Sequence, residues 1–223
     1  MGLLDGEGSI QVNHWRKTSL QYRIVIKLKW NEANEKMLQQ IAEVVGGTVR
    51  QDGNFIIWVE NNREKIKKIL NILEKIPPLT TRLRAQIAFI HTCLKHNNVE
   101  EYIKTRDNKY DNRQQYKPKG DIKLLDYWSA WLSGFIEAEG CFSIRKTGIK
   151  SFSIGQKYEN YLIAEIKSYF QLTCVLRLVK SKVEEYYSIE TYNKESLDMI
   201  KKHFDKNPLI GEKTISYKNF YFE

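Results

Sequence analysis

The sequence predicts an α+β protein built from two similar αββαββα halves. The first observation is an internal repeat, since residues 2–8, GLLDGEG, recur as residues 134–140, GFIEAEG. The second is that residues after each copy match in type at one offset, as Ile10 does with Phe142. The third is that alternating apolar and polar stretches, which are typical of strands, are interleaved with stretches of helical spacing. A chain of 223 residues has room for two small domains of this kind.

Each half is predicted to contain the same elements in the same order. The first motif begins at Met1, so we expect its helix to be short. Turn and cap signals separate the later elements: Gly46-Gly47 ends a helix, Asp52-Gly53-Asn54 joins two strands, and Asn62 is a candidate N-cap. The predicted elements after the first helix are strands at 9–15 and 22–30, a helix at 35–45, strands at 48–50 and 55–59, and helices between Asn62 and Pro77 and at 81–94.

The domain boundaries follow from this repeat. The first half-domain is assigned to residues 1–103 and the second to residues 125–223. Residues 104–124 are assigned to a linker between them, because residues 104–121 are basic, polar and almost without apolar side chains, which predicts a segment that crosses solvent. Its Lys and Arg side chains are candidates for phosphate contacts, and a merely solvated tether is an equally open interpretation.

The charge balance favours a nucleic-acid partner. Lys and Arg total 36 against 27 Asp and Glu, a formal charge of +9. Such an excess suits a polyanion, and because no amphipathic basic helix and no run of about 18 apolar residues occurs, a membrane is not predicted. The start has no basic n-region, and three distant Cys without a CxxC indicate neither a disulfide framework nor a zinc finger. We therefore expect an intracellular protein.

The repeated motif itself suggests a metal site. Its small residues are four positions apart, at Gly2 and Gly6 and again in the second copy, so they share one helix face and allow a second helix to approach closely. If the two motif helices pack together, Glu7 and Glu139 meet, and two close carboxylates repel unless a cation lies between them. A hard divalent ion such as Mg²⁺ fits, with Mn²⁺ or Ca²⁺ as alternatives. Such a site suits phosphodiester hydrolysis.

These motifs resemble those of the LAGLIDADG homing endonucleases, in the single-chain form with two motif copies. Residues 132–140, LSGFIEAEG, form a full second motif, and residues 2–8 form the first motif without its beginning. The resemblance implies two pseudo-twofold-related halves whose sheets form a saddle on double-stranded DNA, in a monomer that acts as an internal pseudo-dimer. It implies a metal-dependent double-strand break at a long, specific site. It also implies an intron-encoded protein of a mitochondrion or another organelle.

The resemblance also assigns site residues. It makes Glu7 and Glu139 catalytic metal ligands, with the backbone carbonyls of Gly6 and Ala138 as further ligands. The earlier motif acids, Asp5 and Glu137, are expected to support the helix junction and not to bind metal.

Polar groups around the attacking water are implied in the same way. Gln156 completes an F-x-x-x-Q strand pattern, which the first copy lacks. Arg82 and Lys213 follow the Pro-Leu turns at matched places and are candidates to polarise the scissile phosphates. Surface charges at the start of a helix are the alternative interpretation of these two.

The outward face of each predicted sheet is basic and polar, as a DNA-binding surface would be. The outward residues differ between the halves, so we expect an asymmetric target. Two alternatives on the same scaffold stay open, an intron-splicing maturase that binds RNA and a catalytically inactive DNA-binding repressor. The candidate DNA contacts are Gln11, Asn13, Trp15, Arg23, Lys27, Lys29 and Arg50 in the first half, and Arg145, Lys150, Arg177, Lys180 and Lys182 in the second.

Overall fold

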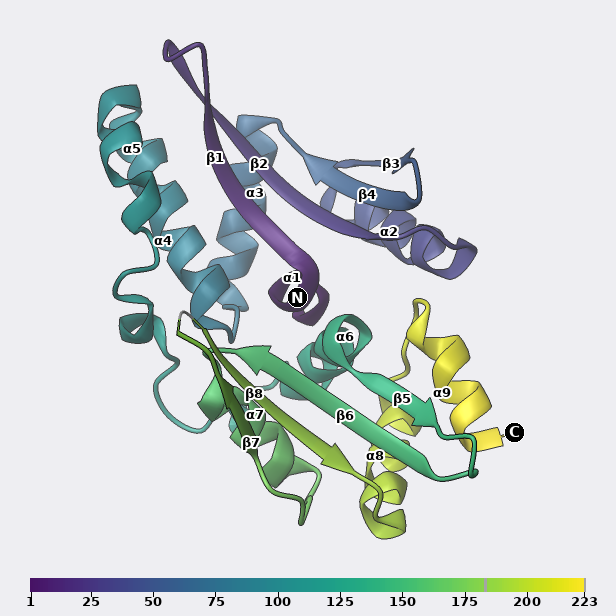
Figure 1. Ribbon diagram of the computed structural model, residues 1–223. Coiled ribbons are helices and arrows are strands. Elements are labelled where there is room, and N and C mark those ends of the chain that lie inside the picture. The colour runs from purple at the N-terminus through teal and green to yellow at the C-terminus, as the bar shows by residue number, and fades with distance from the viewer. Residues whose placement is uncertain (183, 223) are drawn as a thin grey trace. The chain divides into compact units, whose positions relative to one another are not determined.

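The computed structural model describes residues 1–182 and 184–222, and the chain divides into two compact units (Figure 1). The first unit comprises Met1 and Leu3–Lys119, and the second comprises Gly2 and Gly120–Glu223. Each unit is a four-stranded antiparallel sheet with helices packed against one face. The predicted α+β class and the repeat of two similar halves are therefore confirmed.

The first unit contains the elements that the sequence predicts, in the predicted order. Its sheet has the strand order β1-β2-β4-β3. The elements are α1 (Gly2–Glu7), β1 (Gly8–Trp15), β2 (Ser19–Lys29), α2 (Glu32–Val45), β3 (Thr48–Asp52), β4 (Phe55–Glu60), α3 (Arg63–Lys75), α4 (Thr81–His96) and α5 (Val99–Thr105).

The register of this sheet separates an apolar face from a polar one. Ile10 pairs with Ile24, and Ile26 pairs with Trp58, so these buried side chains lie on one face. The helices α2, α3 and α4 contact the sheet and form the core with that face. Because side chains alternate along a strand, the intervening polar residues of β1 and β2 lie on the opposite face.

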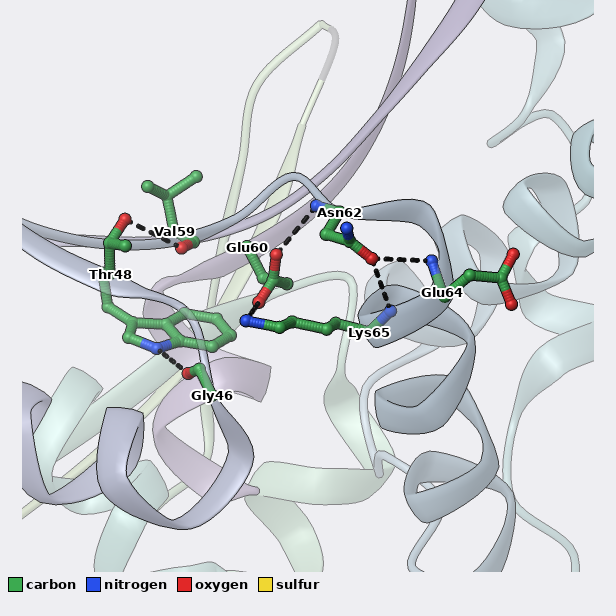
Figure 2. Close-up of polar contacts among 8 residues, drawn as sticks. Gly46, Thr48, Val59, Glu60, Asn62, Glu64 and Lys65 are labelled. Atoms are coloured by element: carbon green, nitrogen blue, oxygen red, sulfur yellow. Dashed lines mark hydrogen bonds and ion pairs between the residues drawn. The ribbon is translucent and has the colours of Figure 1, made fainter.

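The start of α3 shows how a predicted cap works (Figure 2). The Asn62 side chain accepts hydrogen bonds from the backbone N–H groups of Glu64 and Lys65, at 3.0 and 3.1 Å. Glu60 Oε1 in turn accepts the Asn62 N–H at 2.8 Å, and Glu60 Oε2 lies 4.0 Å from Lys65 Nζ. The N-cap assigned to Asn62 from the sequence is confirmed, because its oxygen satisfies two free donors of the first helical turn.

The segment predicted as a solvent-crossing linker packs on the first unit in part. It contains the end of α5 and 3-10 turns at Arg106–Asn108, Arg113–Tyr116 and Ile122–Leu124. Gln86 Nε2 donates to the Tyr110 hydroxyl at 2.7 Å, and Arg113 Nε donates to Thr81 Oγ1 at 2.8 Å. Both bonds reach α4, so residues 110–113 follow that helix and differ from the free tether that their polar composition indicates.

The second unit repeats the architecture with more aromatic packing. Its sheet has the order β5-β6-β8-β7, and Phe152, Ile154 and Ile189 are buried on the helix-covered face. Phe142 contacts Phe152 and rings of the last two helices. The elements are α6 (Trp128–Glu139), β5 (Cys141–Ile144), β6 (Lys150–Lys157), α7 (Asn160–Tyr169), β7 (Arg177–Lys180), β8 (Glu185–Thr191), α8 (Lys194–Lys206) and α9 (Lys213–Phe222).

Candidate active site

In both units the motif helix ends at an acid and the chain turns at once into a strand. Gly8 follows Glu7 with φ −83° and ψ 164°, and Gly140 follows Glu139 with φ −73° and ψ 151°. A Cβ atom on Gly8 would lie 2.5 Å from the Leu4 carbonyl oxygen, and one on Gly140 would lie 2.8 Å from that of Ile136. The close approach excludes a side chain at this point, so the terminal glycine fixes the exit of each helix and thereby the place of the acid before it.

Glu7 and Glu139 are the last residues of α1 and α6. Glu7 is exposed and Glu139 is half-buried. The C-terminal end of a helix carries the negative end of the backbone dipole, so a carboxylate there adds to a negative potential. Each position therefore attracts a cation.

The earlier motif acid in the first unit is structural. Asp5 is fully buried, its Oδ2 accepts the Leu79 N–H at 2.6 Å, and its Oδ1 accepts the N–H and hydroxyl of Thr80 at 3.2 and 2.5 Å. Thr80 is the N-cap of α4 and accepts the Leu83 N–H. Asp5 thus fixes the start of α4, which is a structural role of the kind that the family resemblance implies for it.

Glu137 has the same role in the second unit. Its carboxylate accepts the backbone N–H groups of Ile210, Gly211 and Lys213, at 3.2, 3.0 and 2.8 Å, in the turn that leads into α9. Burial raises the pKa of Glu137, and the three backbone hydrogen bonds act in the opposite direction. Both earlier acids therefore fix the turn that leads into a later helix of their own unit.

Replacing Asp5 by Asn should lower the free energy of unfolding by about 2 kcal/mol, because an amide loses the charge-assisted bonds and retains one acceptor oxygen for three donors. Chemical denaturation of the variant and the wild type measures this difference. The exposed Asp52, at the end of β3, provides a matched Asp→Asn control that should stay within about 0.5 kcal/mol. Equal stability of both variants would contradict a structural role for Asp5.

The matched basic residues, Arg82 and Lys213, differ in their surroundings. Arg82 Nη1 donates to the Gly8 carbonyl at 2.7 Å, and its Nη2 donates to those of Asp5 and Gly6 at 2.7 and 3.0 Å. The guanidinium thus binds the C-terminal carbonyls of α1. Lys213 is half-buried at the first position of α9, where its backbone N–H binds Glu137.

Gln156 lies beside the second motif acid. Its Nε2 donates to Glu139 Oε1 at 3.0 Å, and its Oε1 accepts the Lys157 N–H at 3.0 Å. The amide orientation is therefore fixed at both ends. Counting along the paired strands from the motif glycine, the position of Gln156 corresponds to Leu28 in the first unit, so the two halves differ at this place.

Sequence reasoning missed Tyr186. A Cβ atom on Gly155 would lie 2.3 Å from the Tyr186 hydroxyl, so the glycine makes room for this ring. Burial raises the pKa of Tyr186, and the charge of Glu139 raises it further. The only sequence signal was a glycine within a strand, which often marks a close approach.

All seven candidate DNA contacts of the first unit share one face of its sheet. Gln11 pairs with Arg23, Lys27 with Ile57, and Ile57 with Arg50, and directly opposed residues point to the same side. This is the face opposite the buried core. The other three candidates, Asn13, Trp15 and Lys29, are an even number of residues away from Gln11 or Lys27 along the same strands and therefore share this face.

The candidate DNA contacts of the second unit do not all lie on one face of its sheet. Arg177 pairs with Ser188 on the outer face, and Arg145 reaches Tyr192 and Glu190. Two candidates differ from the outward orientation that the sequence predicts. Lys150 shares the face of Phe152 and donates from Nζ to the Phe220 carbonyl in α9, and Lys180 shares the face of Leu178 and forms an ion pair with Glu185 at 2.9 Å. Lys182 is exposed after β7.

The donor set of each half suits a weakly held hard cation. Within residues 1–182 and 184–222, no group of three or more His, Cys, Asp and Glu side chains is gathered to hold a metal. One carboxylate at a helix C-terminus fits Mg²⁺, which keeps several waters and uses substrate phosphate as a ligand. The Gly6 carbonyl fits less well, because the Arg82 guanidinium already donates to it.

Comparison with known proteins agrees with this geometry. The family model described as LAGLIDADG endonuclease matches residues 1–93 and 132–222. A "probable intron-encoded endonuclease aI3" of Dictyostelium citrinum is 39% identical over 226 residues, covering 99% of this chain and 91% of the relative. In the part of the chain that the structure describes, no helix has the length and apolar character needed to cross a membrane.

Solved structures share the fold. The LAGLIDADG meganuclease I-AabMI bound to uncleaved DNA has a TM-score of 0.72 at 20% identity, covering 98% of this chain and 86% of that one. I-SmaMI bound to its uncleaved DNA target in the presence of calcium ions also has a TM-score of 0.72, at 19% identity, covering 98% of this chain and 87% of that one.

Proposed function

Because the chain belongs to the LAGLIDADG endonuclease family, we propose that it is a homing endonuclease that cuts both strands of a long, asymmetric DNA site in a divalent-metal-dependent reaction. The observation that carries this proposal is that both terminal motif acids, Glu7 and Glu139, are present at equivalent helix ends. The basic outer face of the first sheet supports DNA as the substrate.

Glu7 and Glu139 would each be a metal ligand, with Ala138 contributing its backbone carbonyl beside Glu139. A divalent ion, when bound, would neutralise charge that develops on the scissile phosphate and the leaving oxygen. Gln156 orients the Glu139 carboxylate, since its own amide is fixed by the Lys157 N–H. Arg82 positions the end of α1 through three backbone carbonyls, so its contribution to phosphate polarisation is indirect. Lys213 is the candidate to contact phosphate directly.

The outer sheet faces would read the base sequence. A two-stranded ribbon fits the major groove, where Asn and Gln suit adenine and Arg suits guanine. Counting from the motif glycines, Asn13 in β1 corresponds to Arg145 after β5. Because the two halves present different donors at equivalent positions, they would read different half-sites. This supports a target that is not an inverted repeat.

A cleavage selection on a randomised DNA library tests the function. With Mg²⁺ or Mn²⁺ the protein should enrich one long site, and a chelator should abolish the cut. Ca²⁺ should be tested in parallel as a binding ion. Specific binding to structured intron RNA without DNA cleavage would overturn the nuclease proposal in favour of a maturase. The name of the Dictyostelium citrinum relative supports an intron as the location of the gene, and we propose an organellar intron.

DNA affinity should fall steeply with salt. Contacts to four or more phosphates release counterions, so a doubling of monovalent salt should weaken binding at least about tenfold. Titrations of a labelled duplex at several salt concentrations give the slope of log Kd against log salt. Replacing the outward Lys29 by Gln should reduce that slope by about one, whereas Lys150→Gln, on the helix-covered face, should leave it unchanged. A flat plot for the wild type would contradict an extended DNA interface.

A further inference from the structure

A polar cluster lies on the outer face of the second sheet. Glu190 in β8 pairs with Ser153, between the buried Ile189 and Thr191, so its side chain points away from the core. Arg177 at the start of β7 pairs with Ser188 and shares this face. The arginines of this cluster are among the DNA contacts expected from the sequence, and the acid is not.

Glu190 holds two arginines at once. Its Oε2 accepts a hydrogen bond from Arg177 Nη1 at 3.3 Å, and its Oε1 lies 3.9 Å from Arg145 Nη2. Arg145 also donates to the Tyr192 hydroxyl and places its guanidinium carbon 4.7 Å from the centre of that ring. A hydrogen bond to Glu190 is the main cause that raises the pKa of Tyr192. Tyr192 therefore belongs to the same cluster as the two arginines and the carboxylate.

The arginines reach beyond the acid. The side chains of Arg145 and Arg177 are 54% and 61% exposed, whereas that of Glu190 is 25% exposed. The carboxylate therefore lies low on the sheet and fixes two guanidinium groups above it. Long arginine side chains lose conformational entropy when they bind a partner. Ordering them before binding lowers this cost and favours a partner whose groups fit the fixed positions of the two guanidinium groups.

The first unit offers an internal comparison. Following the ladders from the motif glycine, Glu190 corresponds to Val59, and Arg177 corresponds to Arg50. An acid thus replaces an aliphatic residue on only one of two equivalent surfaces. A carboxylate on a surface that faces phosphates weakens the attraction to every DNA sequence. Such a residue is favourable only if it strengthens the preference for particular bases.

We propose that Glu190 is a specificity-determining residue that orders Arg145 and Arg177 for one G·C pair and reduces binding to other DNA. This rests on the proposed function, in which the outer sheet face contacts the duplex. Guanine presents two acceptors, O6 and N7, that suit arginine, and cytosine presents an N4 donor that suits a carboxylate. In this cluster the exposed arginines are available to guanine, and the less exposed Glu190 orders them from below.

Glu190→Gln tests the proposal because it removes the charge and keeps the shape. Base-by-base substitution profiles should show the preference for G·C at one position falling about tenfold, while affinity for random duplex rises several-fold. The matched control is Glu185→Gln in the same strand, which makes the same charge change on the opposite face, where Glu185 pairs with Lys180. It should leave the profile unchanged.

A double-mutant cycle separates ordering from charge alone. In a chain that already carries Arg145→Gln, Glu190→Gln should change the base preference much less than it does in the wild type. The reason is that only Arg177 then remains for Glu190 to order. An unchanged profile, or an even change at all bases like that of an added positive charge, overturns the role of Glu190 while wild-type cleavage leaves the nuclease proposal intact. Failure of the wild type to bind any duplex overturns both.

Discussion

Glu139→Gln should suppress DNA cleavage on the order of 100- to 1000-fold and leave DNA affinity nearly unchanged. The substitution keeps the size of the side chain and removes the negative charge that would hold a divalent ion. The local fold should persist, because Glu137 still binds the turn before α9 and Gly140 still closes the helix end. Conversion of a supercoiled plasmid carrying the target to nicked and linear forms measures the loss.

Glu7→Gln is the matched experiment in the first unit. Glu7 occupies the equivalent helix end, so its replacement should suppress double-strand cleavage as strongly. Binding to the same target, measured separately, distinguishes chemistry from recognition. Cleavage at the wild-type rate by either variant contradicts its assignment as a metal ligand, and loss of binding together with cleavage indicates a structural role instead.

Replacing Gln156 should reduce cleavage by an intermediate amount in the same assay. Its amide donates a hydrogen bond to the Glu139 carboxylate and does not replace it, so Gln156→Leu should slow cleavage less than Glu139→Gln does. Leu is the residue that the first unit has at the equivalent position, Leu28, which shows that the fold accepts it there. An unchanged rate would mean that the carboxylate keeps its orientation without the amide.

The sequence predicted what local chemistry determines. The alternation at Ile10 and Val12, the Asn62 cap and the glycine after each motif acid each act within a few residues, and the structure has them as expected. The turn between β1 and β2 could not be predicted from its residue types. Arg16 and Lys17 adopt positive φ of 46° and 59° there, without the glycine or asparagine that usually marks such a turn.

Long-range contacts limited the prediction of the site. The polar segment at residues 104–124 gave no apolar periodicity, and the hydrogen bonds that Tyr110 and Arg113 form with α4 join residues far apart in the sequence. The binding of Arg82 to the end of α1 and the inward direction of Lys150 depend on which elements lie opposite. Residue type alone does not encode these directions, so the charges could be predicted and their partners could not.

Acid should destabilise the protein through a buried histidine in the second unit. His203 in α8 is 5% exposed, and burial lowers its pKa from 6.5 to about 4. Its ring contacts the Ser133 hydroxyl at 2.9 Å, the Tyr169 hydroxyl at 3.2 Å, and the rings of Phe170 and Phe204. The neutral ring is therefore satisfied in the folded state, and a charged ring would be poorly solvated.

The sign follows from proton linkage. The unfolded chain binds a proton at His203 near pH 6.5 and the folded chain only near pH 4, so this contribution to stability is complete above pH 6.5 and is lost as the pH falls to about 4. The difference corresponds to about 3 kcal/mol of unfolding free energy. The pKa of Glu137 is raised by burial, so its contribution has the opposite sign and is lost as the pH rises.

His203→Gln isolates the histidine contribution, since Gln does not titrate and its amide can still bond to Ser133. Denaturant titrations between pH 4 and pH 7.5 should show the wild type losing about 3 kcal/mol more than the variant as the pH falls. The exposed His96, at the end of α4, is the control, and His96→Gln should follow the wild-type curve. Parallel curves for wild type and His203→Gln would contradict a neutral, buried His203, because both states would then bind its proton over the same range of pH.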